Sequence, residues 1–504
     1  MRRSLYLFLV LVRLYFAVVP SYIHPDEHFQ GPEIITGSIF DWPSYKTWEF
    51  TSDRPVRSVF PLWLIYGPPL TVLKWISEGL GYDVSPMAVF YVLRTLMFLL
   101  SFVLEDWALH ELLPVRGERV TAIILVASSY VTWTYQMHTF SNSIETVVVL
   151  WCLVLMARMR DNVEHTQYRL CIALAFLGVL GVFNRITFPA FLVPAAMQLL
   201  PQLLVKRWRM PVILLAGAVT TLVAVAMDTE HFTGKPLRFR ELPSTAIFTP
   251  WNNLAYNLDS TNLAQHGLHP FWQHFAANLP QLLGPAFPLL LFSSRKDVVF
   301  WSGITGVAVL SCFRHQEPRF LLPAVPLLLA SIEVPKCFAR PWVLLWTVFN
   351  VLAAILFGFY HQAGVLPVQN WITQQPHVSQ VLWWKTYSPP RWVLGAYNVH
   401  INTTDLMGMP VQDATMRLTN LATCYNNDNL TLLVAPSSAS ALDPYLSSAV
   451  SASTLTFEQL LEHRQHVGLD DLAFGDDGVW PTLRRVIGRR GLTVWRVYRE
   501  CYQV

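Results

Sequence analysis

The N-terminal stretch MRRSLYLFLVLVRLYFAVVPSYIHPDEHFQGPE, residues 1–33, decides the fold class. An apolar run follows Arg2 and Arg3, as in a secretory signal peptide. A signal peptide would next show a small-residue cleavage site, whereas here an acidic cluster follows at once and further apolar runs lie downstream. We therefore predict an uncleaved membrane span over residues 5–20, with Arg13 facing protein rather than lipid.

The composition is that of a polytopic membrane protein. Hydrophobic residues make up 53% of the 504 residues and charged residues 14%, whereas soluble domains carry about 25% charged residues. The mean hydropathy is +0.36. A net charge of only +3 argues against a nucleic-acid partner. The 19 Trp and 30 Phe residues are typical of aromatic belts at a membrane interface.

The apolar runs predict the membrane architecture. A span needs about 20 apolar residues, and fewer suffice in a packed bundle. We therefore predict an all-α polytopic membrane protein with about eleven transmembrane helices. The predicted spans are 5–20, 86–104, 120–137, 144–157, 170–183, 187–205, 211–227, 279–292, 298–313, 320–333 and 341–359.

The segment 59–77 is treated differently, because its Gly67-Pro68-Pro69 would break a helix. We predict that it is re-entrant or lies at the membrane interface. If it crossed the membrane, the orientation of the next spans would no longer be consistent.

The basic residues of the short loops set the orientation, because cytosolic loops carry an excess of Lys and Arg. Arg2 and Arg3 place the N-terminus in the cytosol. Every later cytosolic loop is then basic: these loops hold Arg116/Arg119, Arg158/Arg160, Lys206/Arg207/Arg209, Arg295/Lys296 and Lys336/Arg340.

The unusual polar segments fall on the opposite face. They are 21–58, 138–143, 184–185, 228–278, 314–319 and the tail from about 361. This distribution favours a polar site on one membrane face, built from several loops.

We predict two domains. Residues 1–360 form a transmembrane catalytic domain whose first lumenal loop is 21–85, and residues 361–504 form a small lumenal α+β region. The tail contains short β-like runs at 429–435 and 491–498.

The tail also has features of an oxidising lumen. Asn402 and Asn429 each begin an N-x-[ST] glycosylation sequon. Cys424 and Cys501 both lie in the tail and are able to pair, the alternative being two free thiols.

The segment His24-Pro25-Asp26-Glu27-His28 carries the strongest candidate chemistry. One of its carboxylates, facing a cavity under the membrane surface, can act as a general base. The alternatives are a solvated polar turn and a metal site. We predict no metal site.

Cations at other lumenal helix ends suit a phosphate group. Arg185 follows Asn184, and the run Arg314-His315-Gln316-Glu317-Pro318-Arg319 contains two further arginines. Arg54 and Arg57 lie in the first lumenal loop. The alternative for such arginines is that they anchor helices at the interface.

The segment 249–270 is rich in amides, with Trp and Tyr among them, and suits sugar hydroxyls, although Asn-rich segments are usually turns.

We find neither GxGxxG in a βαβ context nor a P-loop. An enzyme on this face would therefore need an activated donor from elsewhere, and a donor attached to a lipid phosphate meets that need.

Eight short motifs together resemble the dolichyl-phosphate-mannose-dependent mannosyltransferases of the GT-C fold, glycosyltransferase family 22. Within this family they look most like the enzymes that add the fourth mannose of a GPI precursor. The motifs are HPDEHFQ (24–30), WEF (48–50) with RPVRSVFP (54–61), TFSNSIET (139–146), GVFNRITFPAF (181–191), DTEHFTGKP (228–236), PWNNLAYN (250–257), HGLHP (266–270) and HQEPRFLLPAVP (315–326).

The resemblance implies inverting transfer of mannose from dolichyl phosphate mannose, in the endoplasmic reticulum lumen, onto the third mannose of a GPI precursor through an α-1,2 bond. No nucleotide, metal or other cofactor is implied, and protein partners are unknown. The base maps onto Asp26, with Glu27 as its neighbour and the alternative base.

The remaining predicted roles follow the same motifs. The residues expected to bind the donor phosphate are His24, Arg57, His138, Arg185, His315, Glu317 and Arg319. Those expected to bind the acceptor are Trp251, Asn252 and Asn253. His138 stands where an arginine is expected in relatives, and His28 where an aromatic residue is more usual.

Other functions remain open at this point. Sibling enzymes acting on the second mannose of GPI, or on the lipid-linked oligosaccharide, share similar motifs. A lipid transporter would place ionisable groups near the bilayer midplane, often with inverted repeats, and we see no repeat here. A catalytically dead scaffold is disfavoured by the intact Asp26–Glu27 pair.

Overall fold

The computed structural model describes residues 2–161, 167–236, 242–265, 267–334, 336–425, 428–446, 455–469, 472 and 474–499. The chain forms two compact units. The helical unit comprises residues 1–17, 46–69 and 92–353, and the sheet unit comprises residues 18–45, 70–91 and 354–504. The predicted division into domains between residues 360 and 361 stays a prediction.

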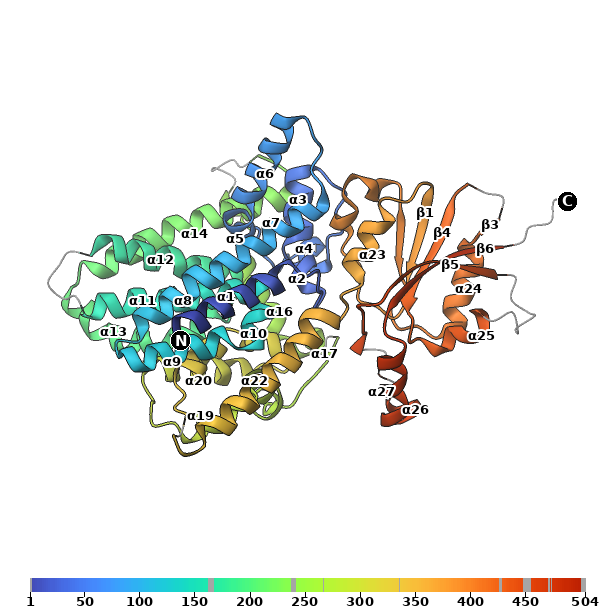
Figure 1. Cartoon of the computed structure of the whole chain (residues 1–504). Coiled ribbons are helices and arrows are strands. Elements are labelled where there is room, and N and C mark those ends of the chain that lie inside the picture. Colours follow the sequence, from blue (N-terminus) through green and yellow to red (C-terminus); the bar gives the residue numbers. More distant parts are fainter. Residues whose placement is uncertain are drawn as a thin grey trace. The chain divides into compact units, whose positions relative to one another are not determined.

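The helical unit is built from helices that pack along one another (Figure 1). The helices that lie wholly or partly in it are α1 (Arg2–Val18), α4 (Trp48–Thr51), α5 (Phe60–Ile65), the first residues of α6 (Gly67–Leu80), α7 (Pro86–Leu99), α8 (Asp106–Leu112), α9 (Arg116–Ala127), α10 (Tyr130–Trp133), α11 (Ser141–Asp161), α12 (Tyr168–Asn184), α13 (Val193–Val205), α14 (Arg209–Thr233), α15 (Leu242–Thr245), α16 (Thr249–Leu258), α17 (Ser260–Ala264), α18 (Leu279–Leu283), α19 (Ala286–Phe292), α20 (Val298–Ser311), α21 (Ala324–Ala330) and α22 (Ala339–Ile355).

Within the described residues, five helices are long and apolar enough to cross a membrane. They are Pro86–Leu112, Ser141–Asp161, Phe188–Val205, Arg209–Thr233 and Lys336–Tyr360. The helices α12 and α20 are apolar but shorter. All seven coincide with predicted spans, which confirms a helical protein with several membrane-type helices. The full count of about eleven stays a prediction.

Two predicted spans are broken helices. The segment 120–137 divides at Ser129, whose side chain accepts the backbone N–H of Val131 and so caps α10. The segment 279–292 belongs to a helix pair that bends by 117° between α18 and α19. At this bend Gly284 has a φ of 52°, and a Cβ atom there would lie 2.2 Å from the ring of Phe349. Both the conformation and the space therefore require glycine.

The segment 59–77 contains a helix break, although at a slightly different place from the one predicted. Helix α5 ends at Ile65, and α6 begins at Gly67, so Pro68 and Pro69 lie in the first turn of α6. Proline is tolerated in a first turn because the N–H groups there have no partner within the helix. Whether this segment crosses the membrane stays a prediction.

Arg13 faces protein, as predicted. It is fully buried, and its Nη2 lies 3.0 Å from Oδ1 of Asp106 on α8. The other side of α1 exposes Leu7, Phe8 and Leu11. This division suits a helix that pairs its one internal charge and turns apolar side chains towards lipid.

Two ion pairs join loops for which the same, cytosolic, side is predicted. The Nε of Arg158 lies 2.8 Å from Oε2 of Glu111. Nη2 of Arg295 lies 3.2 Å from Oε2 of Glu118. The ends of α8, α11 and the α19–α20 connection therefore lie at one end of the helical unit. Which membrane side this end faces stays a prediction.

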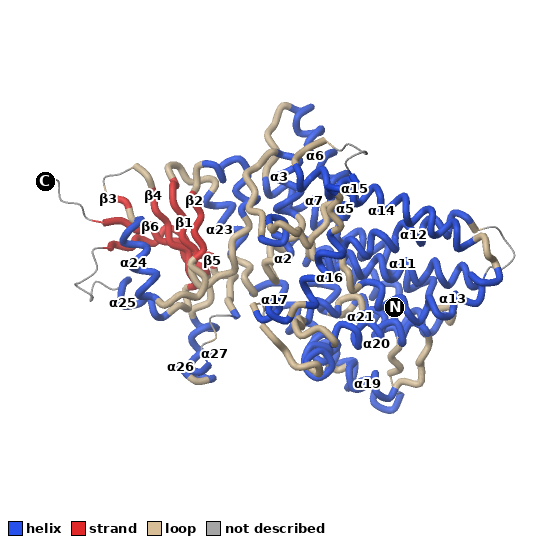
Figure 2. The backbone as a smooth tube through the Cα atoms, turned by 180° about the vertical axis from the view of Figure 1, so that it is seen from behind, coloured by secondary structure: helices blue, strands red, loops and turns tan. Residues whose placement is uncertain are grey.

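The sheet unit contains, within its described residues, a six-stranded mixed sheet in the order β2-β1-β4-β6-β3, with β5 paired to β6 (Figure 2). β1 runs parallel to β2 and β4, and β6 runs antiparallel to β4 and β5. The strands are β1 (Val378–Trp383), β2 (Asn402–Asp405), β3 (Thr423–Cys424), β4 (Leu430–Pro436), β5 (Leu455–His463) and β6 (Leu492–Arg499). The strands predicted near 429–435 and 491–498 are thus confirmed.

Helices cover both faces of this sheet. The helices of the sheet unit include α2 (Asp26–Phe29), α3 (Pro32–Phe40), most of α6 (Gly67–Leu80), α23 (Val365–Ile372), α24 (Val411–Leu421), α25 (Asp443–Leu446), α26 (Phe474–Asp477) and α27 (Val479–Gly488). Successive side chains of a strand point to opposite faces. Accordingly, Val381 and Trp383 share a core with α23, and Leu382 and Trp384 share a core with α24.

Candidate functional site

The segment predicted to hold the base forms the single turn α2 of the sheet unit. Glu27 is fully buried, and its Oε1 accepts the backbone N–H of Ile23 at 2.9 Å. The Asp26 side chain is 24% exposed and lies 3.5 Å from Nδ1 of His24. It also accepts a hydrogen bond from the Gln30 side chain. The two neighbouring carboxylates therefore differ: Glu27 stabilises the turn from inside, whereas Asp26 reaches the surface.

His28 packs in the interior behind Glu27. Its Nε2 lies 3.7 Å from Oε1 of Glu27, and its ring centroid lies 4.8 Å from that of Tyr22. Tyr22 is itself buried and donates its hydroxyl to the Ser388 carbonyl at 2.7 Å. His28 thus packs in the interior against an aromatic side chain.

Glu33 is a buried acid that sequence reasoning missed. Its Oε1 accepts the backbone N–H of Tyr45 at 2.8 Å, and its Oε2 accepts that of Trp392 at 3.2 Å. Burial raises the pKa of Glu33 to about 7, although these donors and Arg391 act to lower it. The available signal was a lone acid within the apolar run PEIITGSIF (32–40).

Asp228, near the C-terminal end of α14, joins three segments of the helical unit. Its Oδ1 accepts the Ser58 hydroxyl and the Val59 N–H, each at 2.9 Å, and its Oδ2 accepts the Thr249 hydroxyl at 2.8 Å. A buried carboxylate needs such partners. These bonds connect motif 54–61 with motif 228–236 and with Thr249, next to motif 250–257. Asp228 was not predicted as a site residue.

The segment predicted to bind the acceptor packs against the Arg57 loop. Asn252 donates from Nδ2 to the Pro55 carbonyl at 3.0 Å, and Asn253 donates from Nδ2 to the Val56 carbonyl at 3.2 Å. These amides position the loop. Trp251, by contrast, is 64% exposed, so its ring is accessible to a ligand.

Two of the arginines predicted to bind phosphate are held by glutamates. The Nε of Arg57 lies 2.9 Å from Oε1 of Glu49, and the Nε of Arg185 lies 3.2 Å from Oε2 of Glu145. Arg57 also interacts electrostatically with Glu145. Nη1 of Arg185 donates to Oγ of Ser141 at 3.3 Å, at the start of α11. Such contacts fix the direction of each guanidinium group.

The cluster around Glu317 adjoins Arg185. Glu317 accepts from Nε of Arg319, and its Oε1 lies 2.8 Å from Nε2 of His315. The ring of Phe320 lies close to two guanidinium groups, with its centroid 4.9 Å from Cζ of Arg185 and 5.2 Å from Cζ of Arg319. Phe320 therefore brings two of the predicted cations together.

His138 is fully buried, with its ring nearly parallel to that of Phe140 at a centroid distance of 6.1 Å. It would have to be uncovered before it touched a phosphate. Its role in phosphate binding stays a prediction.

The tail sites are partly described. Asn402, at the start of β2, and Asn429, just before β4, are both exposed. Cys424 is disulfide-bonded, whereas Cys501 and His266 of the HGLHP motif lie outside the described residues. Cys152, Cys171, Cys312 and Cys337 are free thiols.

The predicted site residues thus fall into two groups. His24, Asp26 and Glu27 belong to the sheet unit, and Arg57, His138, Arg185, Trp251, Asn252, Asn253, His315, Glu317 and Arg319 belong to the helical unit. Among the described residues, no three His, Cys, Asp or Glu side chains gather closely enough to hold a metal ion.

Comparison with known proteins places this geometry in a family. A model described as the Alg9-like mannosyltransferase family matches residues 4–395. The chain is 46% identical to "GPI mannosyltransferase 4" of Aspergillus oryzae, over 99% of each chain. It is 45% identical to the protein of the same name from Emericella nidulans, over 99% of this chain and 98% of that one. A relative of that name in Saccharomyces cerevisiae is 36% identical over 80% of this chain and 79% of its own.

The fold has a solved counterpart. The crystal structure of ArnT from Cupriavidus metallidurans, bound to undecaprenyl phosphate, superposes with a TM-score of 0.51 at 13% identity, covering 97% of each chain. At this identity the comparison shows the fold alone, which is the GT-C membrane fold that the motifs predicted.

Proposed function

The chain belongs to the Alg9-like mannosyltransferase family, and from this premise we propose that it is the α-1,2-mannosyltransferase that adds the fourth mannose to a GPI precursor. It is a glycosyltransferase, so the open questions are the donor, the acceptor and the residues. We propose dolichyl phosphate mannose as donor and the third mannose of the precursor as acceptor. The names of relatives that match nearly the whole chain support this choice.

The observation that carries the mechanism is the contrast between Asp26 and Glu27. Asp26 is partly exposed and accepts a hydrogen bond from Gln30, whereas Glu27 is buried and accepts a backbone N–H. We propose that Asp26 takes the proton of the acceptor hydroxyl. The oxygen then forms a bond to the anomeric carbon, and the bond between that carbon and the phosphate oxygen breaks. Dolichyl phosphate leaves, and the configuration inverts.

The arginines would hold the donor phosphate. Breaking the bond adds negative charge to the phosphate, and fixed guanidinium groups stabilise such charge when it develops. Arg57, Arg185 and Arg319 each keep a glutamate partner, which orients them in advance. His315, bonded to Glu317, and His24 are further proposed donors to the phosphate.

For the acceptor, we propose that the exposed ring of Trp251 stacks on a sugar face. Asn252 and Asn253 would support this surface, because their amides hold the Arg57 loop.

We further propose that neither nucleotide, metal nor other cofactor is required.

The proposed location is the endoplasmic reticulum membrane, with the N-terminus in the cytosol and the catalytic face and C-terminus in the lumen. The basic loops, the exposed sequons and the disulfide-bonded Cys424 support this orientation. The partners would be the lipid-linked donor and the GPI glycolipid.

The test is a mannose-transfer assay in membranes from cells that lack their own fourth-mannose activity. Radiolabelled dolichyl phosphate mannose is offered with three acceptors: a three-mannose GPI precursor, a two-mannose GPI precursor and a truncated lipid-linked oligosaccharide. Addition of EDTA tests for a metal requirement.

The proposal predicts extension of the three-mannose precursor alone, unaffected by EDTA. Extension of a different acceptor would keep the reaction type and assign a sibling enzyme. Transfer that required a sugar nucleotide as donor would contradict the proposal. The absence of any mannose transfer by well-expressed protein would contradict it as well.

A further inference from the structure

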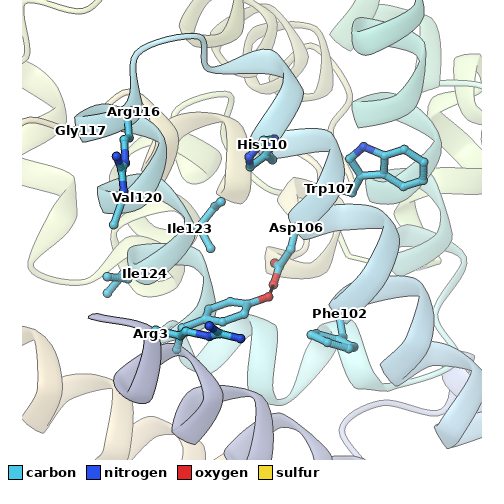
Figure 3. Close-up of a pocket in the computed structure, with 11 residues that line it drawn as sticks. Arg3, Phe102, Asp106, Trp107, His110, Arg116, Gly117, Val120, Ile123 and Ile124 are labelled. Atoms are coloured by element: carbon cyan, nitrogen blue, oxygen red, sulfur yellow. Dashed lines mark hydrogen bonds between the residues drawn. The ribbon is translucent and has the colours of Figure 1, made fainter. Parts of the chain in front are cut away.

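A pocket of about 830 Å³ opens at the end of the helical unit that carries the basic loops (Figure 3). Its walls come from α1, α8 and α9 and from the π-helical turn Leu100–Glu105 that leads into α8. No role in sugar transfer has been assigned to any residue that lines it.

The pocket lies far from the cations proposed to bind the donor. It contains His110 of α8, and the adjacent Glu111 pairs with Arg158 near the C-terminal end of α11. Arg185 instead contacts Ser141 at the N-terminal end of α11. At about 1.5 Å per helical residue, these two ends of α11 are about 25 Å apart. The pocket is therefore a separate site.

The rim of the pocket is cationic. Arg3 of α1 lies at one edge of the pocket and Arg116 of α9 at another (Figure 3). Both are exposed, and within the described part of the chain neither side chain has a hydrogen-bond or ion-pair partner. His110 lies on the same rim.

The acid in the wall already has partners. Asp106 accepts the Tyr6 hydroxyl at 2.6 Å and pairs with the buried Arg13 at 3.0 Å. Glu105, behind the wall, accepts from Ser101 and also acts on Arg13. The two outward arginines therefore keep their charge available for an anion at the rim.

The remaining surface is mainly apolar. Phe102, Val120, Ile123 and Ile124 line the interior, beside the ring of Tyr6. The neighbouring outer face of α1 exposes Leu7 and Leu11. A soluble anion would leave this apolar surface unfilled, whereas a lipid supplies both a phosphate and a hydrocarbon chain.

We propose that this pocket binds one anionic phospholipid, with its head group at the cationic rim formed by Arg3, His110 and Arg116 and an acyl chain against Phe102, Ile123 and Ile124. The site is independent of the proposed donor and acceptor sites, because it lies at the opposite end of α11. The bound lipid would come from the leaflet that faces the basic loops, and it would stabilise the packing of α1, α8 and α9.

The test is native mass spectrometry of the purified full-length protein in detergent, titrated with phosphatidylserine or phosphatidylcholine. We expect one phosphatidylserine to be retained in preference to phosphatidylcholine. Arg3→Gln with Arg116→Gln should weaken this binding about tenfold or more, since each cation near a membrane surface contributes on the order of 1 kcal/mol. The melting temperature without lipid should be unchanged, because both side chains lack protein partners.

The matched control is Arg169→Gln with Arg207→Gln. These exposed arginines also lack partners within the described residues and lie near loops of the same predicted side. The control should bind phosphatidylserine like the wild type. Equal losses in both double variants would show diffuse charge attraction and overturn the site.

A second variant tests the cavity without changing charge. Gly117 lines the pocket, and a Cβ atom there would meet nothing within 4 Å. Gly117→Phe should fill the space and lower lipid retention, with no loss of thermal stability. Undiminished retention in this variant, or binding of soluble glycerophosphoserine as tight as that of the lipid, would contradict a lipid site.

Discussion

At the scale of single residues, Asp26 and Glu27 show how position within one turn divides two neighbouring acids. The pattern HPDEH predicts a candidate base but cannot choose between its carboxylates, because that choice depends on burial. Glu27 is fully buried and accepts the backbone N–H of Ile23, whereas the Asp26 side chain is 24% exposed. Burial thus favours Asp26 as the group that meets a substrate.

Glu33 gives the first prediction, on pH dependence. Its pKa is about 7 in the folded protein, raised by burial from 4.5. Between these values the folded state binds more protons than the unfolded state, so stability falls as pH rises from about 4.5 to 7. The loss should reach about 3 kcal/mol. Melting temperatures of the wild type should therefore fall between pH 5 and 7.5.

The control for this effect is Glu33→Gln, which keeps an acceptor oxygen and cannot ionise. Its melting temperature should change less with pH than that of the wild type. An identical pH profile in the two proteins would assign the dependence to other groups.

At the scale of elements, local patterns predicted helices and strands well and their interruptions poorly. The strands β4 and β6 and the long helix α14 follow from runs of apolar residues. The breaks at Ser129 and Gly284 do not, because they depend on distant partners: Asn350 accepts the Tyr130 N–H at 2.7 Å, and Phe349 occupies the space beside Gly284. Hydrophobic periodicity carries no information on such contacts.

Asp228 belongs to the same class of long-range contact and gives the second prediction. Asp228→Ala would leave Ser58, Val59 and Thr249 without their acceptor. We expect a loss of stability on the order of 3 kcal/mol, since each buried unpaired donor costs about 1 kcal/mol or more. Mannose transfer should fall as well, because the loop that holds Arg57 loses its anchor.

The comparison is with Glu230→Ala, which removes an exposed acid two residues along the same helix. Melting temperature and transfer rate of this variant should match the wild type. An unchanged melting temperature in Asp228→Ala would refute its anchoring role.

At the scale of the whole molecule, composition and loop charge were sufficient to predict a polytopic membrane protein with its basic loops on one side. The pairs Arg158–Glu111 and Arg295–Glu118 bring three of these loops to one end of the helical unit. The family motifs further allowed the GT-C fold to be predicted. The approach of both Arg185 and Arg319 to the Phe320 ring could not be predicted, because two segments far apart in the sequence must fold together before they meet.

The orientation of the whole chain gives the third prediction. Asn402 and Asn429 are exposed, and a lumenal tail would present both to the glycosylation machinery. Each of Asn402→Gln and Asn429→Gln should remove one glycan, seen as a step in electrophoretic mobility that endoglycosidase treatment abolishes. Asn257→Gln, outside any sequon, should leave mobility unchanged. Unglycosylated wild-type protein would contradict the proposed orientation.

The central claim is that Asp26 is the base of mannosyl transfer, and the most direct measurement compares Asp26→Asn with Asp41→Asn. Asp41 is an exposed acid of the same loop, with a side chain 91% exposed and a left-handed backbone that asparagine tolerates. Transfer to the three-mannose precursor is measured at saturating donor and equal protein levels. We predict a loss of about 100-fold or more for Asp26→Asn and wild-type activity for Asp41→Asn. Full activity in Asp26→Asn would contradict the claim and point to Glu27 or a more distant carboxylate.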